Sequence, residues 1–282
     1  MSLVGNTSVV VSEVLLSLYP ILVKVVPTNF DTGLLARFAV FTAASLLFYS
    51  GQTIHLGKVF LYGLVTLFHV VMSYTAFSNL SAGTSMSLFY TFPIMNIVAG
   101  LLFLGETISP LAILFVLLGF VGTLLLSQEI PSEEVKGERP IEIPQNLAIW
   151  TGLLAAFSET LMFLVIRDTK TTNPIDSMLQ LYPGAFILFG LYVLLGQRTI
   201  DRNPVNWAKL GLFNLIIGFG GYSLRAYSIN KVSTVVFSLL SFVGVLSSYA
   251  FGKLFVGETS SWKTYLGAML IACSAAGVTL VF

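Results

Sequence analysis

The chain consists of long apolar stretches separated by short polar joints. Each stretch has about the 20 residues that an α-helix needs to cross the hydrocarbon core of a bilayer. The apolar positions are continuous and do not alternate, so a membrane β-barrel is rejected. Divided at its joints, the chain predicts ten spans: Val9–Val26, Gly33–Tyr49, Val59–Ser78, Gly83–Leu104, Pro110–Leu126, Leu147–Ile166, Met178–Leu195, Val205–Ile229, Ser233–Val256 and Trp262–Val281.

The composition supports this interpretation and excludes several classes of protein. Apolar residues make up 56% of the 282-residue chain and charged residues 10%, whereas a soluble domain carries about 25% charged residues. The mean hydropathy is +0.89. A net charge of +1 offers no basic stripe for nucleic acid. The single cysteine, Cys273, excludes an intrachain disulfide framework and a thiolate metal cluster. We therefore expect a multi-pass protein of the plasma membrane, rather than of an organelle, without a cofactor or a metal.

One segment near the middle of the chain is too polar to cross a bilayer. Between Gln128 and Gln145 it holds five glutamates, two basic residues and three prolines. Five predicted spans precede it and five follow. We interpret residues 128–146 as a linker between two five-helix units, 1–127 and 147–282.

The two halves contain matching short segments in the same order. Each unit has five spans, which is an odd number. The second unit must therefore enter the membrane with the opposite orientation to the first. The sequence thus predicts an all-α integral membrane protein with ten transmembrane helices in two inverted five-helix repeats, suited to alternating access. The matches are Ser12-Glu13-Val14-Leu15 with Ser158-Glu159-Thr160-Leu161, Leu104-Gly105-Glu106-Thr107 with Val256-Gly257-Glu258-Thr259, and Gly122-Thr123-Leu124 with Gly277-Val278-Thr279.

These residues also carry a family resemblance. The fourth span has Phe92-Pro93-Ile94 and ends in Gly105-Glu106, the ninth ends in Gly257-Glu258, and Lys24 and Arg37 bracket the first loop. In this the chain resembles the EamA-like ten-helix members of the drug/metabolite transporter superfamily. It departs from the pattern in the ninth span, where Gly244-Val245 stands in place of a Phe-Pro pair. The resemblance implies a secondary transporter of small metabolites with cytoplasmic termini. The basic residues favour the opposite orientation, so orientation stays open.

Four ionisable residues stand out inside the predicted spans, where such groups are costly and point to function: Glu13, His69, Glu159 and Arg225. Snorkelling at the interface or a buried pair that fixes packing is the alternative. Tyr90, one turn before Pro93, is the aromatic candidate for a cavity. Because Glu13 and Glu159 occupy equivalent places in the repeat, we hypothesise that these two carboxyl groups form the substrate and coupling site, with a proton as the driving ion.

Two other patterns favour a structural role. The glutamates of the Gly-Glu pairs, Glu106 and Glu258, are expected at the interface, each facing a basic or hydroxyl neighbour. Small residues permit close helix contact, within the bundle or in a homodimer, and the sequence leaves both open. These small residues are Gly119, Gly122, Ala268, Ala272 and Ala276.

A membrane enzyme is the main rival function. His55 and His69 lack a partner at metal-ligand spacing, and no later histidine could serve a nucleophile as its base, so we do not expect an enzyme. A non-transporting receptor or scaffold stays open. Among substrates, an amino acid or related zwitterion would use Glu13 or Glu159 for its amine and Arg225 or Tyr90 for its carboxylate. A nucleotide-sugar or phosphate-ester exchanger would want a basic cluster, and two intramembrane carboxylates favour the zwitterion.

Overall fold

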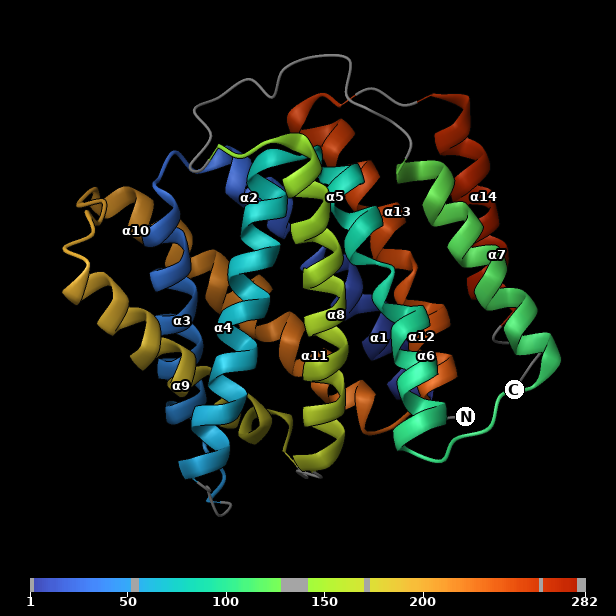
Figure 1. Ribbon diagram of the computed structural model, residues 1–282, viewed down its shortest axis with the longest axis horizontal. Helices are drawn as coiled ribbons and strands as arrows, with labels where there is room; N and C mark the ends of the chain where they lie inside the picture. Colours follow the sequence, from blue (N-terminus) through green and yellow to red (C-terminus); the bar gives the residue numbers. More distant parts are fainter. Residues whose placement is uncertain (1–2, 52–55, 128–141, 170–172, 259–260, 278–282) are drawn as a thin grey trace.

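The computed structural model describes residues 3–51, 56–127, 142–169, 173–258 and 261–277. These residues form ten membrane crossings (Figure 1), and seven of the helices are long and apolar enough to span a bilayer. The crossings are α1 (Leu3–Leu16) with α2 (Tyr19–Val25), α3 (Phe30–Leu47), α4 (Leu56–Asn79), α5 (Ala82–Phe89) with α6 (Phe92–Phe103), α7 (Pro110–Ser127), α8 (Gln145–Thr169), α9 (Pro174–Leu195), α10 (Pro204–Phe213) with the π-helix η1 (Asn214–Phe219) and α11 (Gly220–Ile229), α12 (Thr234–Ser241) with α13 (Val243–Phe251) and the π-helix η2 (Gly252–Val256), and α14 (Trp262–Ala276).

The ten predicted spans all correspond to observed crossings, although their bounds and continuity differ. The first helix begins at Leu3 and not at Val9. The first, fourth, eighth and ninth crossings are interrupted rather than single helices. Pro20 and Pro93 lie in the first turn of α2 and α6, where proline is tolerated because those N–H groups have no partner inside the helix. Most of the predicted linker, residues 128–141, lies outside the described residues.

The two halves contact each other in equivalent pairs, as an inverted repeat requires. Helix α4 packs along α8, and its counterpart in the second half, α11, packs along α1. The counterparts α3 and α9 pack against each other, as do α7 and α14. In Figure 1, α1 rises toward α2 at the top, whereas its counterpart α8 descends. The predicted fold class is therefore confirmed.

Apolar side chains cover the outside of the bundle, and aromatic side chains fill its centre. Leu102, Phe103 and Leu254 are 70%, 72% and 74% exposed, which suits a surface in contact with lipid tails. The centre contains fully buried rings on helices of both halves. They include Phe38, Phe41, Phe92, Phe163, Tyr182, Phe237 and Phe242.

The glycines predicted to permit close helix contact do so inside the bundle. A side chain on Gly122 would meet the backbone of Gly267 on α14, and one on Gly119 would meet Phe242 and Ser274. In contrast, Ala272 and Ala276 are exposed. The glycines therefore hold α7 against α14, while a homodimer contact stays a prediction.

Glycine also sets the crossing of α4 and α9, and this makes a test of the packing. A Cβ on Gly184 would lie 3.1 Å from Gly63 Cα and would collide with the carbonyl oxygen of Val59. We expect Gly184→Ala to destabilise the protein by about 1–3 kcal/mol, the usual cost of overpacking. The control is Gly190→Ala on the same helix, where nothing lies within 4 Å. Thermal unfolding in detergent checks both, and an equal response of the two variants would contradict the close crossing.

Candidate functional site

A polar cluster lies where three of the crossings are interrupted. Glu13 sits one turn before α1 ends at Leu16. Tyr90 lies between α5 and α6, and Phe242 lies between α12 and α13. Interrupted helices of this kind commonly form the binding sites of transporters that are built from inverted repeats. The three breaks bring side chains of both halves to one place in the bundle.

Arg225 on α11 binds the two glutamates of the cluster. Its Nε donates to Glu13 Oε1 over 3.0 Å and its Nη2 to Glu13 Oε2 over 2.6 Å, which is a bidentate pair. Its Nη1 donates to Glu159 Oε1. The three side chains are at most 4% exposed. Two carboxylates from α1 and α8 therefore share one guanidinium deep inside the protein.

Hydroxyl groups complete the surroundings of Glu13. Tyr90 donates to Glu13 Oε2 over 2.5 Å, and Ser241 Oγ donates to Glu13 Oε1 over 3.3 Å. A side chain at Gly244 would collide with the Tyr90 hydroxyl. Gly244, which stands in the place of the phenylalanine of the Phe-Pro pair in the ninth span, thus makes room for Tyr90 beside the carboxylate.

Glu159 belongs to a second hydrogen-bonded group. His69 Nε2 lies 3.2 Å from Glu159 Oε2 and 3.1 Å from Tyr222 OH, and that hydroxyl lies 3.4 Å from the same carboxylate oxygen. On its other side, His69 Nδ1 lies 3.2 Å from Ser158 Oγ. An imidazole, a phenol and a carboxyl group in contact can hold a proton at several atoms. Within the described residues, no three His, Cys, Asp or Glu side chains are placed to hold a metal ion.

The structure brings all five residues predicted from the sequence into this cluster. The first half contributes Glu13, His69 and Tyr90, and the second half contributes Glu159 and Arg225. Sequence reasoning missed Tyr222 and Ser241. A signal for Tyr222 was present, because it precedes Arg225 by three residues and so lies on the same helix face. Nothing in the sequence pattern distinguished Ser241 from the other buried serines.

Sequence reasoning also missed the environment of Arg37, which is 2% exposed in α3. Its Nη2 donates to Tyr182 OH over 3.3 Å, while its buried Nε has no hydrogen-bond partner. In the described part of the chain, no carboxylate lies within ion-pair distance of this guanidinium. Instead it lies over four rings, with Arg37 Cζ 4.3–5.7 Å from their centroids. We call these rings the aromatic box: Tyr19, Phe41, Tyr74 and Tyr222.

A partly buried ion pair lies at the upper end of the bundle as drawn in Figure 1. Glu258, after η2, accepts the N–H of Ala82 over 2.7 Å and so caps α5. Lys24 Nζ lies 3.6 Å from Glu258 Oε1 and donates to Leu80 O over 2.8 Å. Gly257 has φ 74°, a left-handed conformation that glycine adopts at low cost. We call this group the upper latch.

The lower end carries the counterpart of each of these contacts. Glu106 follows Gly105, with φ 64°, and accepts the N–H of Thr234 over 3.2 Å and its hydroxyl over 2.7 Å. Arg167 Nη2 lies 3.8 Å from Glu106 Oε1 and donates to Val232 O over 2.8 Å. We call this group the lower latch. As predicted, Glu106 and its counterpart in the upper latch face basic and hydroxyl or backbone partners, and they do so at opposite ends of the molecule.

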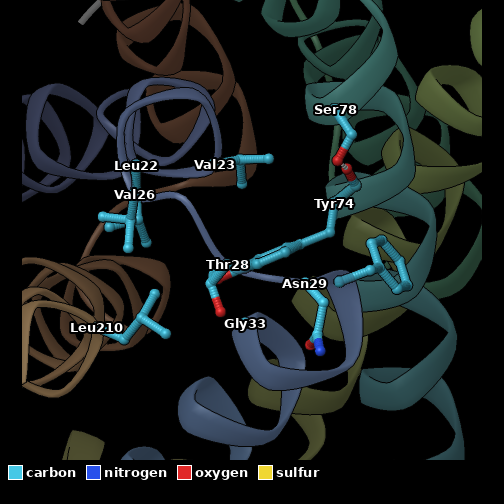
Figure 2. Close-up of a pocket in the computed structure, with 10 residues that line it drawn as sticks. Leu22, Val23, Val26, Thr28, Asn29, Gly33, Tyr74, Ser78 and Leu210 are labelled. Carbon is cyan, nitrogen blue, oxygen red and sulfur yellow. Dashed lines mark hydrogen bonds between the residues drawn. The ribbon is translucent and has the colours of Figure 1, made fainter. Parts of the chain in front are cut away.

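A small, partly open pocket lies between α2, the start of α3, the end of α4 and α10. Figure 2 shows that Tyr74 extends across this pocket toward Thr28. Half of the remaining lining is aliphatic. It includes Leu22, Val23, Val26 and Leu210. The pocket thus lies on the same side of the bundle as the upper latch and adjoins the aromatic box at Tyr74.

Comparison with known proteins agrees with the fold. The profile of the EamA-like transporter family matches residues 3–128 and 146–280. A solved structure, described only as the crystal structure of a protein, superposes with a TM-score of 0.70 over 99% of this chain and 98% of that chain, at 16% sequence identity. At that identity the likeness shows the fold alone. No curated protein sequence matches this chain.

Proposed function

Because this chain belongs to the EamA-like transporter family, and therefore to a family of membrane transporters of small solutes, we propose that it is a secondary active transporter of an amino acid or related zwitterion. It works by alternating access in the plasma membrane and is driven by protons. The observation that carries this proposal is the buried group in which Glu13 and Glu159 share Arg225.

The cluster suits the amine of a zwitterion. In the structure each carboxylate is already bound, Glu13 by Arg225, Tyr90 and Ser241 and Glu159 by Arg225 and the His69 group. A substrate ammonium group can replace one of the Arg225 contacts without leaving either carboxylate unpaired. Since both latches are closed, this conformation corresponds to an occluded state in which the substrate ammonium group has not replaced an Arg225 contact.

The two latches support alternating access. Each joins the end of the broken fourth crossing of one repeat to the start of the equivalent broken crossing in the other, and the inverted symmetry places them at opposite ends of the bundle. Opening the upper latch frees α2 and α5, and opening the lower latch frees α12 from α6 and α8. Because the contacts are equivalent, the two open states differ little in the bonds they break, as alternating access requires.

The contacts around Glu159 support a proton as the driving ion. Glu159, His69 and Tyr222 lie within hydrogen-bond distance of one another and so give a proton a place to bind.

A nucleotide-sugar or phosphate-ester exchanger is the alternative. Such a substrate carries several negative charges and requires several unpaired basic groups. Arg225 is neutralised by two carboxylates, so Arg37 is the one buried guanidinium in the described residues that lacks an acidic partner. One such group suits a single carboxylate better than a diphosphate.

A ligand screen tests the substrate class. Purified protein is heated with amino acids, amines, nucleotide sugars and sugar phosphates, and a bound ligand raises the unfolding midpoint. We expect amino acids to give the largest rise, and the most effective one to accumulate in proteoliposomes with a pH gradient. A rise confined to nucleotide sugars or sugar phosphates would favour the alternative. Binding without flux would favour a receptor.

We expect Glu159→Gln to abolish accumulation driven by a pH gradient while leaving substrate exchange partly intact. The amide has nearly the volume of the acid, but it cannot load and release a proton beside His69. Glu13→Gln should weaken substrate binding more, because Glu13 makes the larger number of contacts in the cluster. The measurement is uptake of the labelled amino acid selected by the screen, with and without the gradient.

Asp31→Asn is the matched control, since this carboxylate lies in the first turn of α3, beside Arg198 and away from the cluster. It should leave gradient-driven uptake unchanged. Normal gradient-driven uptake by both single variants and by the double variant of Glu13 and Glu159 would return the pair to a purely structural role.

A further inference from the structure

We infer that Arg37, inside its aromatic box, binds the carboxylate of the substrate, and that the adjoining pocket holds the aliphatic side chain of an amino acid. This inference rests on the proposed function and deepens it, because it names the substrate as an aliphatic amino acid. It also moves the carboxylate site from Arg225, where the sequence placed it, to a different helix.

The first argument is the missing counterion. A buried charge is costly unless it is paired and hydrogen-bonded, and a guanidinium has five N–H donors to satisfy. Arg37 is 2% exposed, and its Nε has no partner. The rings of the aromatic box stabilise the cation but carry no negative charge. A carboxylate is the planar anion that a guanidinium binds through two parallel hydrogen bonds.

The second argument is the contrast with Arg225. That guanidinium uses Nε, Nη1 and Nη2 on two carboxylates, so it has little capacity for a third. Both guanidinium groups lie near the ring of Tyr222, with Cζ 5.2 Å from its centroid for Arg37 and 5.5 Å for Arg225. The Tyr222 hydroxyl in turn lies 3.4 Å from Glu159 Oε2. Arg37 and Glu159 therefore both lie close to Tyr222, the one as a partner for a substrate carboxylate and the other as a partner for its amine.

The third argument is the route to Arg37. The pocket is lined by Gly33, one helical turn before Arg37, and by Tyr74, a ring of the aromatic box. Residues four apart lie on the same face of a helix, and Arg37 Cζ lies 5.7 Å from the centroid of the Tyr74 ring, so Gly33 and Tyr74 connect the pocket with the surroundings of Arg37. Its lining of leucine and valine side chains matches an aliphatic chain, and Val23 is next to Lys24 of the upper latch.

The fourth argument is an asymmetry between the repeats. Arg37 stands six residues after Asp31, and Tyr182 stands six residues after Asp176, in the counterpart helices α3 and α9. The glutamates and the latches are duplicated, whereas this cation is present in one half. The two repeats are related by an approximate twofold axis. A charge that is present in only one of them determines the orientation in which a small asymmetric ligand binds between the repeats.

The test compares L-leucine, L-leucinamide and 4-methylpentanoate by thermal shift and by equilibrium binding. We expect wild type to bind leucine about tenfold or more tightly than leucinamide, because the amide loses a charged hydrogen-bonded pair. Arg37→Gln should remove this preference, and Arg37→Lys should retain part of it. 4-Methylpentanoate should compete with leucine in wild type and not in Arg37→Gln.

A second pair of variants tests the route without altering charge. Gly33→Leu fills the pocket above Arg37 and should abolish leucine binding. Gly33→Ala is its control, because a Cβ there would lie 3.5 Å from Tyr74, an ordinary contact. Each variant's unfolding midpoint without ligand shows that it is folded, and Arg37→Gln should lower it far less than loss of Arg225, since no carboxylate depends on Arg37.

The outcomes separate this inference from the proposed function. Equal affinity for leucine and leucinamide, retained preference in Arg37→Gln, or normal leucine binding in Gly33→Leu would each overturn it. Absence of leucine binding would also overturn it, yet uptake of another amino acid would leave the proposed function intact. If wild type moves no solute of the screen, the proposed function itself fails.

Discussion

Replacing Arg225 by glutamine is expected to destabilise the protein more than any other single change in the central cluster. The variant would leave the buried carboxylates of Glu13 and Glu159 without a cation, and three charged hydrogen bonds would be lost. Removing one partner of a buried ion pair typically costs about 3–5 kcal/mol. The measurement is the unfolding midpoint in detergent, compared with the midpoints of the single variants Glu13→Gln and Glu159→Gln.

The matched control removes all charge from the cluster at once. In the triple variant Glu13→Gln/Glu159→Gln/Arg225→Gln no ion is left unpaired, and a neutral replacement of a buried ion group is often no less stable than the original. We expect it to regain most of the stability lost in Arg225→Gln while remaining inactive in uptake. A triple variant as unstable as Arg225→Gln would mean that packing, and not charge, explains the loss.

The residues of this cluster could be predicted because lipid makes ionisable groups conspicuous. Glu13, His69, Glu159 and Arg225 interrupt apolar stretches, and each must find a partner. Their partners could not be predicted, since hydropathy does not say which helices meet. The structure shows that one guanidinium serves both glutamates, which the separate roles assigned from the sequence did not anticipate.

Arg37 was missed because its depth depends on where a helix begins. The hydropathy pattern started the second predicted span at Gly33. Arg37 was therefore interpreted as a residue near the end of the span, next to the first loop, and not as a buried one. In the structure the Asn29 side chain accepts the N–H of Thr32, and α3 begins at Phe30. This cap places Arg37 about two turns inside the helix, against rings from distant segments of the chain.

The fold was predicted more completely than the interruptions of its helices. A bilayer imposes an apolar stretch of fixed length on every crossing, and such stretches are visible in one sequence. The break before Pro93 also had a visible cause. The break at Phe242 had none, because no proline lies near it.

Removing either latch glutamate is expected to shift the protein toward the state that is open on that side. Glu258→Ala deletes the cap of α5 and the Lys24 pair, and Glu106→Ala deletes the equivalent contacts with Thr234 and Arg167. Charged hydrogen bonds are worth about 1.5–3 kcal/mol each, and about 1.4 kcal/mol changes an equilibrium tenfold. The two variants should therefore change the open populations by about tenfold or more, in opposite directions.

Reporter cysteines measure the two populations separately. In a background with Cys273 replaced by serine, Ser85→Cys on α5 reports on the upper side and Ser238→Cys on α12 on the lower side, and both positions are buried in the closed structure. Maleimide labelling at Ser85→Cys should rise in Glu258→Ala and fall in Glu106→Ala, with the reverse at Ser238→Cys. If each variant raises both reporters, the latches maintain local folding and do not govern access. The reciprocal pattern arises only when opening one end holds the other end closed, because a latch that merely secured its own helices would leave the distant reporter unchanged.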